Sequence, residues 1–269
     1  MTKFLSNLFN FLFDTSIYFL PKWKQLTCKA RLHNLLEPVY ETKINNKKLK
    51  LFTPNRKCIY WLRTGPNSEP STNEWISSFS KDDILVDVGA NIGLYSLLAG
   101  ICGIRKVYAI EANPFSFSVL SRNIIENGLS NKIIALCLPI GESSSIIKFN
   151  LSSTEAGTIG NEIASKTTQD KKLSIFSASF SLDELFRAQS IKNVTHLKID
   201  VDGIEKGILM GAKNLLDSPN LKSVLVEDIE GYNKDKNELD TLMANHGFSN
   251  SIEWGQDGSA NKIYEKQSA

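Results

Sequence analysis

The fold is decided by one stretch of sequence, Ile84-Leu85-Val86-Asp87-Val88-Gly89-Ala90-Asn91-Ile92-Gly93-Leu94. Its apolar run at 84–88 predicts a strand that is buried on both faces, as the strands of a parallel sheet are. Gly89 and Gly93 predict a tight turn, and the apolar run at 94–101 predicts a helix after it. A strand, a glycine-rich turn and a helix in this order form the ligand-binding unit of open α/β sheets, in which ligands bind beyond the carboxyl ends of the strands.

The rest of the chain repeats this alternation of apolar strands and amphipathic helices. It predicts an α/β fold with a mostly parallel sheet and helices on both faces. The segment from about 142 to 180 is rich in Ser, Thr and Gly, breaks the alternation and predicts a β-rich insertion or a loop. The other predicted elements are strands at 106–110, 132–138, 197–201 and 223–227, helices at 114–127, 204–216 and 238–246, and one or two closing strands in 250–266.

The first twenty residues predict a helix with an apolar face. They lack the cleavage site of a signal peptide, and they are too short and polar for a transmembrane span. Two interpretations stay open: a helix packed on the domain, which is the commoner case, and an interfacial helix in contact with a membrane, which Lys22 and Lys24 favour. The residues at helical spacing are Phe4, Leu5, Leu8, Phe9, Leu12 and Phe13.

A β-hairpin is expected between this helical segment and the main domain. The runs 49–52 and 58–62 are rich in β-formers, and Thr53-Pro54-Asn55 between them predicts a turn. The composition of residues 64–68 is that of a loop. We therefore expect an accessory segment at 1–67 and the main domain at 68–269.

The composition narrows the class of protein. The chain of 269 residues has 31 basic and 29 acidic side chains, so its net charge of +2 disfavours a nucleic-acid-binding protein. Its four cysteines form no CxxC pair and predict free thiols in a reducing compartment. We expect a cytoplasmic protein with a small-molecule or glycan partner, with membrane contact through residues 1–20 as the alternative. No feature predicts an oligomeric state.

The glycine-rich turn has the wrong spacing for a dinucleotide. That fingerprint places glycines at relative positions 1, 3 and 6, whereas the small residues here are Gly89, Asn91 and Gly93. S-adenosylmethionine has no pyrophosphate, and Asp87 can hydrogen-bond to its methionine end, directly or through water. Glu111 ends the second strand, where a carboxylate can accept both ribose hydroxyls. The spacing therefore predicts S-adenosylmethionine as the cofactor.

Five further blocks of sequence support a family resemblance that covers roughly residues 45–266. They are Glu69-Pro70-x-Thr72-x-x-Trp75-Ile76, Ile110-Glu111-Ala112-Asn113-Pro114, Asn123-Ile124-x-x-Asn127-Gly128, Ser181-Leu182-Asp183-Glu184-Leu185 and Leu197-Lys198-Ile199-Asp200-Val201-Asp202-Gly203-x-Glu205. Together with the loop they resemble the FkbM family of S-adenosylmethionine-dependent methyltransferases. Ala112 replaces a usual proline, and Asp202 stands where the family more often has Glu. The resemblance implies a class I methyltransferase Rossmann-like fold and methyl transfer to oxygen, typically a sugar or polyketide hydroxyl.

The expected catalytic residues are acids at the ends of the fourth and fifth strands, Asp200, Asp202 and Glu227. Methyl transfer is an in-line displacement that depends on alignment, and a hydroxyl nucleophile benefits from a base or a metal. Asp200 or Asp202 is predicted to act as the base or to orient the hydroxyl, with Glu227 in support. A divalent metal on these three acids is the less favoured alternative, and no metal site is predicted. Lys198 either pairs with one of them or contacts the substrate.

The expected cofactor-binding residues come from both sides of the turn. Glu69 and Thr72 reach the methionine end from the N-terminal side, or cap a helix. The leading hypothesis is an S-adenosylmethionine-dependent O-methyltransferase acting on a hydroxyl of a sugar, glycan or related natural product. A nicotinamide-dependent oxidoreductase and a non-catalytic, membrane-associated binding module are the alternatives. The full cofactor set is Glu69, Thr72, Asp87, Gly89, Asn91, Gly93 and Glu111.

Overall fold

The computed structural model divides the chain into two compact units, Met1–Pro38 and Val39–Ala269. The first unit contains the helices α1 (Thr2–Ile17) and α2 (Lys22–Leu35). Across all the ranges described, no helix combines the length and the apolar character that crossing a membrane requires. The structure describes residues 1–163, 173–201, 203–227, 238–252 and 261–267.

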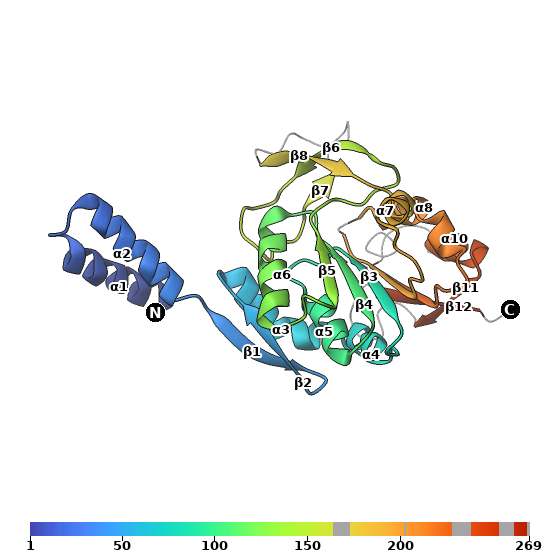
Figure 1. Cartoon of the computed structure of the whole chain (residues 1–269), viewed down its shortest axis with the longest axis horizontal. Coiled ribbons are helices and arrows are strands. Elements are labelled where there is room, and N and C mark those ends of the chain that lie inside the picture. Colours follow the sequence, from blue (N-terminus) through green and yellow to red (C-terminus); the bar gives the residue numbers. More distant parts are fainter. Residues whose placement is uncertain (164–172, 202, 228–237, 253–260, 268–269) are drawn as a thin grey trace. The chain divides into compact units, whose positions relative to one another are not determined.

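A seven-stranded sheet forms the centre of the second unit (Figure 1). Its strands are β3 (Ile84–Val88), β4 (Lys106–Ile110), β5 (Ile133–Leu136), β9 (His196–Ile199), β10 (Ser223–Glu227), β11 (Phe248–Ile252) and β12 (Asn261–Lys266). They lie in the order β11-β12-β10-β9-β3-β4-β5. The five strands from β10 to β5 are parallel, and β12 and β11 close one edge in antiparallel pairing. The strand order reverses at β3, which pairs with β4 on one side and β9 on the other, and a ligand cleft is expected there.

The predicted parallel sheet with helices on both faces is confirmed. All five residues of β3 are buried, and alternate side chains enter opposite cores: Val86 lies in one apolar cluster and Leu85 in the other. The Leu85 core includes α4 (Pro70–Ser77), α5 (Leu94–Cys102) and α6 (Pro114–Glu126). The Val86 core includes α7 (Leu182–Gln189), α8 (Glu205–Met210), α9 (Lys213–Leu216) and α10 (Glu238–Asn245).

The predicted hairpin exists, but its residues differ. It consists of β1 (Val39–Ile44) and β2 (Lys47–Phe52), joined at Asn45 and Asn46, whose positive φ angles suit a two-residue turn. Residues 58–62, predicted as its second strand, lie in α3 (Arg56–Ser68). The Asn55 side chain accepts the backbone N–H of Cys58 and caps this helix, so the predicted turn is a helix start and residues 64–68 continue the helix.

This hairpin packs on the main domain. Leu49 and Leu51 are fully buried in the same core as α5 and α6. The backbone N–H groups of Lys50 and Phe52 donate to the side chains of Asn127 and Asn123. The compact unit therefore begins at Val39, which differs from the expected division after residue 67.

The insertion after β5 is β-rich. It forms a three-stranded antiparallel sheet of order β7-β6-β8, from β6 (Ser145–Asn150), β7 (Glu162–Ile163) and β8 (Ser174–Ser179). Its backbone at Glu142 lies against Gly211, where a Cβ would approach the Glu142 carbonyl oxygen to 2.6 Å. The predicted helix at 204–216 is accordingly divided at this point into α8 and α9.

Candidate active site

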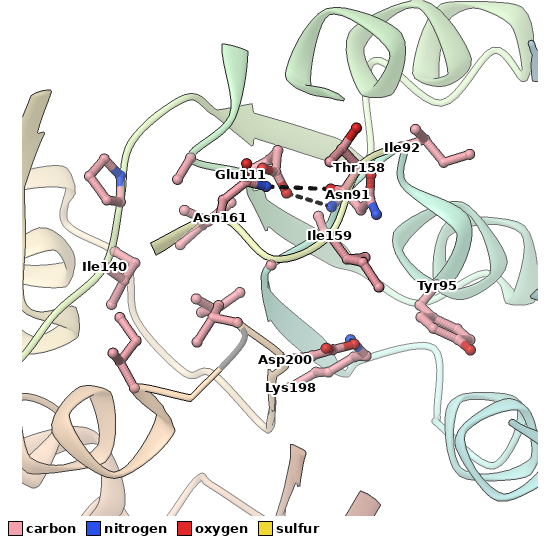
Figure 2. Close-up of a pocket in the computed structure, with 18 of the residues that line it drawn as sticks. Asn91, Ile92, Tyr95, Glu111, Ile140, Thr158, Ile159, Asn161, Lys198 and Asp200 are labelled. Carbon is pink, nitrogen blue, oxygen red and sulfur yellow. Dashed lines mark hydrogen bonds and ion pairs between the residues drawn. The ribbon is translucent and has the colours of Figure 1, made fainter. Parts of the chain in front are cut away.

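A pocket lies beyond the carboxyl ends of β3, β4 and β9, where the strand order reverses (Figure 2). Residues that follow these three strands line it, and the small sheet adds Phe149 and Ile163. Figure 2 shows Asn91 and Glu111 together in one part of the pocket and Lys198 and Asp200 together in another. The arrangement places a polar loop and a charged pair in the same cavity.

Gly89 brings the loop against the end of β9. Its φ is +83°, and a Cβ would lie 1.8 Å from the carbonyl oxygen of Asp200. Gly93 has a φ of +93°, and its Cβ would lie 2.5 Å from the Leu120 side chain. The close neighbours of both glycines are protein atoms, so packing within the chain requires glycine at these two positions. Gly89 also lines the pocket, so the loop forms one wall of it beside the Asp200 backbone.

Glu111 fastens the loop to the end of β4. Its carboxylate accepts the backbone N–H of Asn91 and that of Asn113, each at 2.7 Å. Asn91 has a φ of +51° and, within the described residues, its buried Oδ1 has no hydrogen-bond partner. Both Glu111 and Asn91 line the pocket, which thus presents an acid and an amide oxygen at this end.

Lys198 is fully buried between two carboxylates. Its Nζ lies 2.7 Å from Asp200 Oδ2 and 3.7 Å from Asp87 Oδ1. Burial favours the neutral amine, but the charges of Asp200 and Asp87 outweigh it and raise the pKa of Lys198. Asp87 lies beneath the loop and accepts the Ser96 hydroxyl at 2.6 Å; burial nevertheless raises the pKa of Asp87. Lys198 and Asp200 line the pocket, and the expected pairing of Lys198 with an acid is present.

Asp200 and Glu227 influence each other's protonation and have opposite pKa shifts. Burial raises the pKa of Asp200, but the Lys198 charge and hydrogen bonds from Lys198 and Glu227 outweigh it, so the net pKa is lowered. Burial, followed by repulsion from Asp200, raises the pKa of Glu227 to about 9. At neutral pH the proton therefore stays on Glu227 and Asp200 is a carboxylate.

Two other acids follow β9 in the sequence, Glu205 and Asp202. Glu205 accepts the backbone N–H groups of Val201 and Gly203 at 3.2 and 3.0 Å, which fixes the turn before α8. Asp202 lies outside the described residues. Among the residues that the structure describes, no cluster of three or more His, Cys, Asp or Glu side chains could hold a metal ion.

Glu69 reaches the pocket from the start of α4. It accepts hydrogen bonds from Thr72 Oγ1 at 2.9 Å and from Asn261 Nδ2 at 2.7 Å. Thr72 is fully buried behind Glu69, so its observed role is to hold that acid. Tyr95 also lines the pocket, with its ring 5.0 Å from Lys198 Nζ.

Tyr95 and Asn261 were not among the predicted site residues. Tyr95 lies in the first turn of α5, the helix that follows the glycine-rich turn, and this position in the sequence could have predicted that it lines the pocket. Asn261 hydrogen-bonds to Glu69, which is 192 residues away in the sequence, and no local sequence pattern predicts such a contact.

Comparison with known proteins identifies the family. Residues 87–249 match the methyltransferase FkbM domain. The chain is 31% identical over 173 residues to the hexuronic acid methyltransferase AglP of Haloferax volcanii, covering 64% of this chain and 66% of AglP. The chain thus spans just under two thirds of that relative. It is 25% identical over 214 residues to the methyltransferase sdnD of Sordaria araneosa, covering 68% of this chain and 81% of sdnD.

Among solved structures, M. jannaschii TYW2 in complex with AdoMet aligns with 86% of this chain and 88% of its own, at 14% identity and a TM-score of 0.43. The assignment rests on the domain match, which replaces the oxidoreductase interpretation with a methyltransferase. Because residues 87–249 make up more than half of the chain, the protein belongs to the FkbM methyltransferase family.

Proposed function

We propose that this methyltransferase takes its methyl group from S-adenosylmethionine and transfers it to an oxygen of a sugar. One observation carries the proposal: a single pocket contains the loop fastened by Glu111 and the Lys198–Asp200 pair. A donor and an acceptor must meet in one cavity for in-line transfer, because the nucleophile has to be aligned with the methyl group.

The residues at the loop end fit this cofactor. Each Glu111 oxygen has two lone pairs, and a carboxylate in this position suits the two hydroxyls of a ribose. Ile140 and Phe149 give the pocket an apolar lining that suits a purine ring. When bound, S-adenosylmethionine supplies an electrophilic methyl group.

Asp200 is the proposed base. Its side chain is 30% exposed and lines the pocket, so an acceptor hydroxyl can approach it. Lys198 and the protonated Glu227 hold its carboxylate as an anion. Asp200 would orient the hydroxyl while the oxygen–methyl bond forms and the methyl–sulfur bond of the bound cofactor breaks, which leaves a neutral thioether. The hydroxyl proton becomes strongly acidic as its oxygen gains the methyl group, so the Asp200 carboxylate can receive it although its pKa is lowered. Glu227 acts through Asp200 and is a positioning residue.

The sugar class is suggested by the relative named as a hexuronic acid methyltransferase. Trp61 supports it, since this indole lines the pocket and its Nε1 donates to the Gly157 carbonyl at 2.9 Å. A held aromatic ring offers a flat apolar surface to the C–H face of a sugar.

Calorimetric titration tests the cofactor. We expect S-adenosylmethionine to bind the wild type and to lose at least about tenfold in affinity with Glu111→Ala, because that change removes the charged hydrogen-bond acceptor. Glu41→Gln, on the exposed hairpin, is the control and should bind as the wild type does. Absence of binding to the wild type, or equal binding to Glu111→Ala, contradicts the proposed cofactor site.

The acceptor is tested with glycosides of hexuronic acids and matched neutral sugars, with methylation read by mass spectrometry. Mild alkali then separates two products, because a methyl ester is hydrolysed and a methyl ether is not. Asp200→Asn should lower kcat by about a hundredfold while cofactor affinity changes little. A product that mild alkali cleaves would replace the hydroxyl with a carboxylate as the acceptor group.

A further inference from the structure

The first unit leaves most of its apolar side chains uncovered by its own packing. Ile17 is its buried residue within α1, and Asp14 on the same helix forms an ion pair of 2.8 Å with Lys29 on α2. Six further apolar side chains of α1 are 42–69% exposed, and they repeat at helical spacing over about two and a half turns. They are Phe4, Leu5, Leu8, Phe9, Phe11 and Leu12.

Large aromatic and apolar side chains extend this surface into the turn and α2. Tyr18 and Phe19 are 82% and 79% exposed, and Trp23 and Leu26 are 65% and 58% exposed. Tyr and Trp prefer the boundary between water and lipid, since their rings are apolar and each carries one polar group. We call the exposed apolar residues from Phe4 to Leu26 the apolar surface of the first unit.

Basic residues outnumber acidic ones in the first unit. The first unit, residues 1–38, contains five Lys or Arg residues and two acids, Asp14 and Glu37, so its net charge is 5 − 2 = +3. Asp14 is already paired with Lys29. The whole chain has a net charge of only +2, which means that the excess is concentrated in the first unit. The basic residues are Lys3, Lys22, Lys24, Lys29 and Arg31.

We propose that residues 1–36 dock on a membrane surface that contains anionic lipids. The apolar side chains of α1 enter the boundary between headgroups and acyl chains, and the lysines of α2 contact lipid phosphates. Neither helix spans the membrane, in agreement with the lengths and composition of α1 and α2. A second copy of the same unit is disfavoured as the occupant, because it would bring one unit of charge +3 against another.

Vesicle flotation with the full-length chain tests this inference. Wild type should bind vesicles of phosphatidylcholine mixed with phosphatidylglycerol at least about tenfold more tightly than vesicles of phosphatidylcholine alone, and salt should weaken the binding. Lys22→Glu/Lys24→Glu should lose at least about tenfold on the mixed vesicles. Lys43→Glu/Lys47→Glu, which changes two exposed lysines of the hairpin β1–β2, should bind as the wild type does.

A second pair of variants tests the apolar part. Phe4→Ser/Phe11→Ser should abolish flotation, whereas Phe176→Ser, at a 77% exposed position of β8, should not reduce it. Circular dichroism of each variant verifies that its helix content is unchanged. Equal binding to both vesicle types, or equal losses in variants and controls, overturns the proposal. A third outcome also overturns it: the wild type does not bind vesicles, sediments as a dimer, and the dimer dissociates in Phe4→Ser/Phe11→Ser. A second copy of the chain is then the occupant of the apolar surface.

Discussion

The ammonium group of Lys198 compensates the negative charges of two carboxylates, those of Asp87 and Asp200. We predict that Lys198→Met lowers the free energy of unfolding by about 3 kcal/mol at neutral pH, because Asp87 and Asp200 would be left without their cation. Urea denaturation measures the loss. Lys81→Met, at an exposed position, should change stability by less than about 0.5 kcal/mol. A similar small effect at both positions would show that this ion pair is not needed for the fold.

Glu227 makes the free energy of unfolding depend on pH, and the substitution Glu227→Gln should remove this contribution. Its pKa is raised from 4.5 in the unfolded chain to about 9 in the fold, so the folded protein holds a proton that the unfolded chain releases. This contribution is complete below pH 4.5 and is lost as pH rises through about 9. Between these values the wild type should therefore lose stability relative to Glu227→Gln, which does not titrate.

Urea denaturation of both proteins across this pH range checks the sign. The difference between the two free energies of unfolding isolates Glu227 from every other titrating group, including His196, whose pKa burial lowers to about 4. A difference that is constant with pH would contradict the shared proton between Glu227 and Asp200.

At the scale of elements, the turn after β3 packs closely on the end of β9 at Gly89 and Asp200. Gly89→Ala should lower the free energy of unfolding by at least about 2 kcal/mol, because its Cβ would overlap a backbone oxygen and its φ is unfavourable. Gly103→Ala is the matched control: its φ is +95°, and no atom lies within 4 Å of the added Cβ. It should cost about 1 kcal/mol, the backbone strain alone. Thermal unfolding compares the two variants, and equal losses would mean that the contact with Asp200 is unimportant.

The elements that the sequence predicts best are those buried on both faces. β4 and β10 have the predicted bounds because an uninterrupted apolar run belongs to a central parallel strand. The run at 58–62 is equally rich in β-formers, yet it is helical because Asn55 caps it. Site residues on strand ends, such as Glu111 and Asp200, were predictable from their position. The hydrogen bond from Asn261 to Glu69 depends on the pairing of β12 at the edge of the sheet. A local sequence pattern does not encode that pairing.

At the scale of the whole molecule, the division after Pro38 predicts that the second unit folds alone. A chain that begins at Val39 should unfold cooperatively, with a Tm within a few degrees of the full-length protein, because the buried cores of the sheet lie within residues 39–269. Calorimetry of both proteins measures this. A truncated chain that aggregates or unfolds without cooperativity would show that the first unit is part of the fold.

The contact between Gly89 and the Asp200 carbonyl also has an evolutionary meaning. It holds the loop that is proposed to bind the methyl donor against the backbone of the proposed base, so position 89 has to remain glycine whatever side chain stands at position 200. The part of the pocket lining from Phe149 to Ile163 belongs to the insertion with the small sheet β7-β6-β8 and does not take part in this contact. Descendants of one ancestor can therefore acquire new acceptors through substitutions in this part of the pocket lining. A designer who wants a new sugar specificity should begin with the same residues.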